Sequence, residues 1–168
     1  MLTQRYLTFL AACGIAHANK CIPSGCADLQ CYGHKSRDRK SYTVYRGEKA
    51  INVSCDFVTD GGGWTVLLRR NRSESVDFNR SWNDYITGFG DPQSEFWVGL
   101  DPATQLIAGL DIILRHDVIT SDGSRRHAIY TGFRLGSARN MYRFVYAAFN
   151  RTLSTMRESR DQGLANNI

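Results

Sequence analysis

The residues that could support catalysis are scattered along this 168-residue chain. The histidines beyond residue 20 are His34, His116 and His127. No Gly-x-Ser-x-Gly or His-Glu-x-x-His pattern is present, and Gly61–Gly63 lacks the Lys-Ser/Thr pair of a phosphate-binding loop. Asp111 and Asp117 flank a predicted strand, so we interpret them as surface carboxylates. We predict that the chain is not an enzyme and assign no catalytic residue.

The N-terminus has the pattern of a secretory signal peptide. Arg5 precedes an apolar run from Tyr6 to Ala16, and Ala16-His17-Ala18 fits the small-x-small cleavage site. The run is shorter than the ~20 residues that span a bilayer. The pattern predicts a signal peptide over residues 1–18 and a secreted, extracellular chain without a membrane span.

Cysteines are the next candidates for chemistry. Cleavage after Ala18 would remove Cys13 and leave an even number. The remaining cysteines are Cys21, Cys26, Cys31 and Cys55. An even number in a secreted chain predicts disulfides, and four cysteines allow three connectivities. A zinc site is the weaker interpretation because no Cys-x-x-Cys spacing occurs, and we predict no metal site.

Four Asn-x-Ser/Thr sequons make the chain a candidate glycoprotein. The candidate asparagines are Asn52, Asn71, Asn79 and Asn150. Asn71 and Asn79 lie in loop-like surroundings and are the better candidates. Asn52 lies beside a predicted strand and a cysteine, so we expect it to be less accessible.

Composition indicates one ordinary globular domain with a basic surface. Hydrophobic residues make up 42% of the chain, charged residues 22%, and the formal net charge is +5. Arg69, Arg70 and Arg72 form one local cluster, and Arg125 with Arg126 forms another. Neither is a long basic stretch interleaved with aromatic residues, so we predict no nucleic-acid partner. The first cluster is a candidate site for a sulfated glycan.

A glycine-rich turn and two helix starts organise the middle of the chain. Residues 53–58 and 64–70 flank Asp60-Gly61-Gly62-Gly63 and predict a β-hairpin, with Trp64 pointing into the core. A helix is expected over residues 81–86, capped by Ser81, and another begins at Asp101-Pro102.

Further strands are expected on both sides of this region. They cover residues 42–45, 110–119, 126–135 and 141–149. In the last strand Tyr142, Phe144 and Tyr146 would share one face. We expect residues 19–25 to be a short segment before the domain, residues 26–149 to form the domain, and residues 150–168 to form a divergent polar tail.

Cys55 to Trp97 resembles the N-terminal part of a fibrinogen C-terminal, or fibrinogen-related, domain. The matching motifs are Cys55-Asp56, Thr59–Val66, Arg69-Arg70, Asp77-Phe78, Trp82, Gly88-Phe89-Gly90 and Glu95-Phe96-Trp97. The resemblance extends from about Cys26 to Phe149. It implies an incomplete domain of α+β class, with a twisted antiparallel sheet and short helices. It also implies a disulfide between Cys26 and Cys55, which leaves Cys21 and Cys31 to pair with each other or to join chains.

The resemblance implies a lectin-like recognition protein of innate immunity that binds glycans or microbial surfaces. The alternative is a structural or receptor-binding protein of adhesion or signalling. The family's calcium loop and ligand pocket lie in a portion without a counterpart here, so we expect no cofactor and assign no ligand-binding residue. The family's sheet also takes a strand from that portion. An unpaired neighbouring strand would favour a homo-oligomer.

Overall fold

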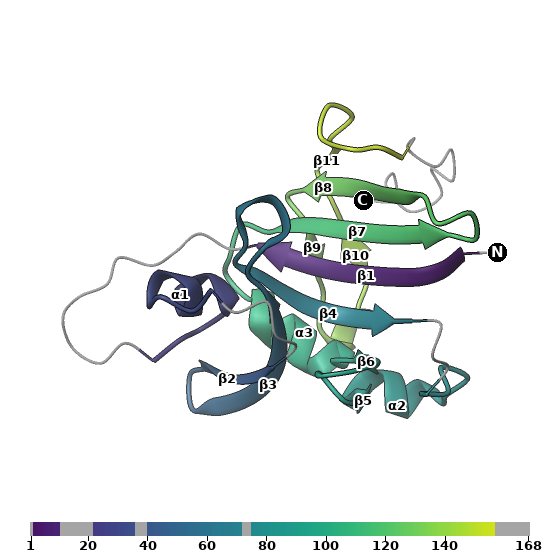
Figure 1. The fold of residues 1–168 in the computed structure, drawn as a ribbon. Helices are drawn as coiled ribbons and strands as arrows, with labels where there is room; N and C mark the ends of the chain where they lie inside the picture. Colours follow the sequence, from purple (N-terminus) through teal and green to yellow (C-terminus); the bar gives the residue numbers. More distant parts are fainter. Residues whose placement is uncertain (1, 11–21, 36–39, 72–74, 157–168) are drawn as a thin grey trace.

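One large antiparallel sheet forms the body of the protein. The computed structural model describes residues 2–10, 22–35, 40–71 and 75–156. The main path of the sheet has the order β11-β8-β7-β1-β4-β3-β2, and short helices lie beside it (Figure 1). The predicted α+β class, with a twisted antiparallel sheet and short helices, is confirmed.

The predicted hairpin joins β3 (Lys49–Asp56) to β4 (Trp64–Arg70). A 3-10 turn at Thr59–Gly61 connects them, and the Asp56 carboxylate accepts hydrogen bonds from the amides of Val58 and Thr59 at 2.8 and 2.9 Å. Gly62 has a φ of 83°, and a Cβ there would collide with the Phe57 backbone. Trp64 is buried, as predicted. Almost all of β4 is buried because the strand is covered on both faces.

Two elements precede this hairpin after residue 21. Helix α1 (Cys26–Cys31) was not predicted; it begins without a side-chain cap, which removes the local signal for it. Strand β2 (Ser41–Arg46) pairs with β3 along its whole length. Together, β2 and β3 form the curved hairpin at one end of the sheet (Figure 1).

The region between β4 and β7 packs beneath the sheet. Helix α2 (Trp82–Thr87) begins with a complete capping box between Ser81 and Asp84. Ser81 is therefore the N-cap, as predicted. Strands β5 (Phe89–Gly90) and β6 (Phe96–Trp97) follow, and β6 pairs with the second half of β4. Helix α3 (Leu100–Ile107) places Leu106 and Ile107 in the core.

The C-terminal strands are shorter than predicted. Strands β7 (Ile113–Thr120) and β8 (Arg125–Thr131) form a hairpin. Beyond β8 the chain continues through three two-residue strands. These are β9 (Arg134–Leu135), β10 (Phe144–Val145) and β11 (Ala148–Phe149).

The predicted single strand over residues 141–149 is wrong. Met141 and Tyr142 have φ values of 56° and 53°, a left-handed conformation that ends an extended run. Tyr142 is consequently buried while Phe144 is exposed, so the expected common face does not form. The predicted strand over residues 126–135 also divides, at Gly132, whose φ is 62°.

Residues 150–156 return along the outer side of β8. Ser154 Oγ accepts a hydrogen bond from the Ile129 amide at 2.9 Å, and Thr155 Oγ1 accepts one from the His127 amide at 2.7 Å. These contacts partly satisfy the backbone groups of β8 beyond its short ladder with β11.

The N-terminal segment forms β1 (Leu2–Leu10), which lies between β4 and β7. In Figure 1 it is the purple strand within the sheet. Both β4 and β7 are therefore paired in this structure, and the unpaired neighbour expected above is not seen. Removal of residues 1–18 as a signal peptide remains a prediction, as do the domain boundaries.

Candidate functional site

The disulfide between Cys26 and Cys55 fastens α1 to the central hairpin. Its S–S distance is 2.01 Å, and the Cys26 amide donates to Thr65 Oγ1 on β4 at 3.2 Å. This is the pair that the resemblance implies. Cys31 is also disulfide-bonded, and Cys21, its expected partner, lies outside the described residues.

Replacing Cys55 with serine is expected to lower the free energy of unfolding by about 2–4 kcal/mol, because the bridge closes a loop between residues 29 positions apart. Urea unfolding of the oxidised protein and the variant would measure this difference. Non-reducing peptide mapping is the control, and a Cys55 thiol that alkylates freely in the native protein would contradict the prediction.

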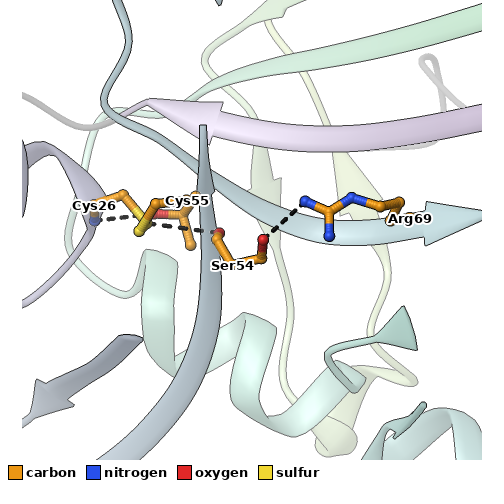
Figure 2. Close-up of a disulfide and its surroundings, with 5 residues drawn as sticks. Cys26, Ser54, Cys55 and Arg69 are labelled. Atoms are coloured by element: carbon orange, nitrogen blue, oxygen red, sulfur yellow. Dashed lines mark hydrogen bonds between the residues drawn. A yellow bond between two sulfur atoms is a disulfide. The ribbon is translucent and has the colours of Figure 1, made fainter. Parts of the chain in front are cut away.

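Arg69 does not belong to an exposed anion site. Its side chain is buried beside the disulfide, where Nη2 donates to Ser54 Oγ at 2.8 Å (Figure 2). Nη1 donates to the carbonyl of Pro92, also at 2.8 Å. Arg70 is exposed and lies over the Phe78 ring, while Arg72 is outside the described residues. The prediction that three arginines form an anion site is therefore wrong for Arg69, because its guanidinium is buried and donates to Ser54 and Pro92.

The histidines do not converge. His34 packs against the rings of Tyr42 and Phe57, and a ring nitrogen of His127 lies 2.6 Å from the Leu153 carbonyl oxygen. His116 lies on β7, opposite Ala128. Within the part of the chain that the structure describes, no three His, Cys, Asp or Glu residues could hold a metal ion together.

The sequon asparagines differ in exposure. Asn52 and Asn79 are exposed, whereas Asn71 and Asn150 are half-buried. The expectation that Asn52 would be less accessible is wrong, because its side chain points outward from β3. Asn52 and Asn79 are therefore the better-placed attachment points, and glycosylation of all four asparagines remains a prediction.

A buried arginine connects β7 to the turn before β4. Arg115 Nε and Nη2 donate to the two carboxylate oxygens of Asp117 at 2.7 and 2.8 Å, and Nη1 pairs with Asp60. Burial lowers the pKa of the Arg115 guanidinium, but the hydrogen bonds and charges of Asp117 and Asp60 outweigh it, so the pKa is raised. Asp111, the other predicted surface carboxylate, is exposed.

The described surface also has an aromatic corner formed by Trp82, Met141 and Tyr142. Trp82 is 55% exposed and Met141 is 76% exposed. The Trp82 and Tyr142 rings make an edge-to-face contact with centroids 6.2 Å apart. Trp82 is the first residue of α2, where the Ser81 hydroxyl holds the N-terminal turn and lowers the pKa of Asp84.

One hydrogen bond to α3 fixes the position of Tyr142 in this corner. Tyr142 Oη donates to Asp101 Oδ1 at 2.6 Å, and this contact raises the pKa of Tyr142. The two consecutive left-handed residues, Met141 and Tyr142, turn the chain so that one side chain points outward and the next inward. Sequence reasoning missed this corner, because it expects residues 141–149 to form one strand and so does not place Tyr142 against Trp82.

The Tyr142–Asp101 contact predicts a pH effect at the alkaline end. A raised pKa means that the neutral phenol stabilises the fold below the unfolded value near ~10, and this contribution is lost as pH rises through the folded pKa. Thermal melts of the wild type and Tyr142→Phe should therefore differ at pH 7 and converge only as the pH rises through the raised pKa of the folded protein. A difference that stays constant across this range would contradict the assignment.

Comparison with known proteins places this fold among fibrinogen-like domains. The family model for the C-terminal globular domain of fibrinogen beta and gamma chains matches residues 22–166, which reaches past the expected boundary at Phe149. Among solved structures, the fibrinogen-like globe domain of human ANGPTL6 superposes with a TM-score of 0.71 and 32% identity. That match covers 80% of this chain and 60% of the other.

Curated relatives give the same result. Tenascin of Mus musculus is 40% identical over 114 residues, which is 66% of this chain and 5% of tenascin. Fibrinogen-like protein A of Apostichopus parvimensis is 36% identical over 140 residues, 82% of this chain and 49% of that protein. The chain thus spans about half or less of the length of these relatives. No helix among the described residues is long and apolar enough to cross a membrane.

Proposed function

The chain belongs to the family of fibrinogen C-terminal domains, and from this premise we propose that it is a secreted, lectin-like recognition protein of innate immunity that binds glycans or microbial surfaces. The disulfide between Cys26 and Cys55 supports the extracellular location, because such bonds persist in oxidising compartments. The predicted signal peptide and the exposed sequons at Asn52 and Asn79 support the same location.

The observation that carries the proposal is the aromatic corner. An indole ring that is half-exposed at a helix start offers a flat apolar face and one N–H donor, which suits the mixed surface of a sugar ring. The capping box and the Tyr142–Asp101 hydrogen bond hold this ring in place before any ligand arrives. A site held in advance loses less conformational freedom on binding.

The alternative function is binding of an extracellular protein in adhesion or signalling. The same corner favours it, because Trp, Tyr and Met are enriched at protein interfaces and large aromatic residues dominate their energetics. Both functions use recognition rather than catalysis, and both place the same side chains in contact with the ligand.

Binding of the full chain to an acetylated-sugar resin would test the glycan proposal. The wild type should be retained, and Trp82→Ala should lower affinity roughly tenfold, because a contact worth ~1.4 kcal/mol is lost. Tyr45→Ala is the matched control, since Tyr45 is also an exposed aromatic residue but lies on β2, away from the corner. Retention should be the same in calcium and in chelator.

Equal retention of the wild type and Trp82→Ala would show that the aromatic corner is not part of the glycan-binding site. A wild type that is not retained, but that binds cell-surface protein in a Trp82-dependent manner, would favour the adhesion or signalling alternative. Neither result depends on the oligomeric state, which sedimentation at several concentrations would establish separately.

A further inference from the structure

The outer edge of β8 is covered mainly by a segment that is not a strand. Beyond the short ladder with β11, the chain beside β8 is residues 150–156, which we call the strap (Figure 1). The Asn150 amide donates to the Ile129 carbonyl at 2.8 Å, and the Thr155 amide donates to the His127 carbonyl at 2.9 Å. Two carbonyls on the outer edge of β8 are thus paired with backbone amides of the strap.

The N–H groups of the same edge are paired with side chains instead. The Ile129 amide donates to Ser154 Oγ at 2.9 Å, and the His127 amide donates to Thr155 Oγ1 at 2.7 Å. A ring nitrogen of His127 also lies 2.6 Å from the Leu153 carbonyl oxygen. In a regular ladder the acceptors would be backbone carbonyls. The strap therefore satisfies the edge through two hydroxyl groups, without adding another strand to the sheet.

The direction of the backbone groups along β8 follows from its pairing with β7. The Thr120 amide donates to the Ser124 carbonyl at the turn between these strands, so the even-numbered residues of β8 form its hydrogen-bonded pairs with β7. The odd-numbered residues Arg125, His127 and Ile129 direct their N–H and C=O groups away from β7. Without the strap, this edge would be a template for pairing with another extended chain.

We propose that the strap guards a self-association surface. When the strap is displaced, residues Arg125–Ile129 pair antiparallel with the same residues of a second copy, about a twofold axis at His127. Strand β11 keeps its place, because it pairs with β8 beyond this stretch. This inference goes beyond the proposed function and involves none of the residues of the aromatic corner.

The charges of β8 favour this antiparallel arrangement. Arg125 and Arg126 are adjacent and exposed at one end of the strand. A parallel pair of β8 strands would place these arginines beside those of the second copy, and like charges in this position are destabilising. In the antiparallel pair Arg125 lies opposite Ile129 and Arg126 lies opposite Ala128. The two copies of Arg125 are then about 14 Å apart along the strands. The same surface is thus complementary to itself, as a twofold interface requires.

Loosening the strap in the full chain tests whether it guards the edge. Ser154→Ala combined with Thr155→Val removes the two hydroxyl acceptors. Sedimentation at several concentrations should show that the Kd for self-association falls at least roughly tenfold relative to the wild type, because both straps of a dimer must open and each loses its hydrogen bonds more easily. Thr152→Val is the matched control, since Thr152 is an exposed hydroxyl of the strap outside the bonds described above, and it should keep the wild-type Kd.

Cysteine cross-linking tests the register of the proposed pair. His127→Cys in the loosened variant should give a covalent dimer under oxidising conditions. The two residues on the twofold axis form a hydrogen-bonded pair with Cα atoms about 5.5 Å apart, a distance that a disulfide can bridge. Arg125→Cys in the same background should cross-link at least roughly tenfold less, because its Cα atoms would be about 14 Å apart or more. The loosened variant without an added cysteine is the background control.

Hydrogen exchange gives an independent readout of the same edge. In the loosened variant the amides of His127 and Ile129 should exchange faster than in the wild type at low concentration. They should regain protection as the concentration rises, while the β2–β3 ladder stays unchanged. The proposal is overturned if the loosened variant keeps the wild-type Kd, or if Arg125→Cys cross-links as efficiently as His127→Cys. It is equally overturned if the two edge amides gain no protection with concentration.

Discussion

Replacing Trp64 with alanine is expected to lower the free energy of unfolding by about 3–5 kcal/mol. The indole is only 4% exposed, and it follows the glycines that bring the turn close to the Phe57 backbone. Its Nε1 also donates to the Thr59 carbonyl at 2.8 Å, so the ring fixes the turn as well as filling space. Removing it would leave a cavity and would take away one of the two hydrogen bonds that the Thr59 carbonyl accepts, since the Gly62 amide also donates to it.

Urea unfolding followed by circular dichroism would measure the Trp64→Ala effect. Trp64→Phe separates the two contributions, because phenylalanine keeps most of the apolar area but cannot donate to Thr59; we expect a smaller loss of about 1–2 kcal/mol. If alanine and phenylalanine variants unfolded at the same urea concentration as the wild type, the ring would contribute nothing to stability.

Glu95→Ala is the second change with a large expected effect. Glu95 is 0% exposed, and its carboxylate accepts hydrogen bonds from Asn71 and from Ser75. Oε1 accepts from the Asn71 amide at 2.6 Å, and Oε2 accepts from the Ser75 amide and hydroxyl, both at 2.7 Å. Alanine would remove the acceptor of these donors, and the free energy of unfolding should fall by about 3–5 kcal/mol, because hydrogen bonds to a charged group contribute about 1.5–3 kcal/mol each.

Two matched variants make the Glu95 prediction specific. Glu95→Gln keeps the size and one acceptor oxygen, so it should lose less than alanine. Glu48→Ala removes an exposed carboxylate between β2 and β3 and should change stability by less than about 0.5 kcal/mol. The prediction would be contradicted if thermal unfolding placed Glu95→Ala within the range of Glu48→Ala.

The elements that could be predicted are those that depend on local sequence patterns. The glycine-rich turn specifies the β3–β4 hairpin, because only a few residues tolerate the left-handed conformations it needs. Ser81 predicts the start of α2, because its hydroxyl accepts a hydrogen bond from the Asp84 amide within one turn. The β-branched residues of β7 likewise predict a strand from nearest neighbours alone.

Long-range effects explain the rest. No local feature indicates that Arg69 points inward, because its acceptors at Ser54 and Pro92 come from distant parts of the chain. The left-handed turn at Met141 and Tyr142 is stabilised by the hydrogen bond from Tyr142 to Asp101 on α3. The alternation of apolar and polar residues along the sequence does not reveal this contact. The place of residues 2–10 in the sheet is not predictable from local sequence either, because its partner strands β4 and β7 are distant along the chain.

The central position of β1 also determines the order in which the sheet can be completed during synthesis. Arg5 pairs with Arg70 and Leu2 pairs with Thr120, so residues 2–10 are made well before both of their partner strands. Contacts of such high sequence separation form slowly, whereas the β2–β3 and β7–β8 hairpins can close locally. As long as residues 2–10 stay attached to the chain, this strand must therefore remain unpaired until β7 has been made, and an unpaired strand in a nascent chain is prone to aggregation.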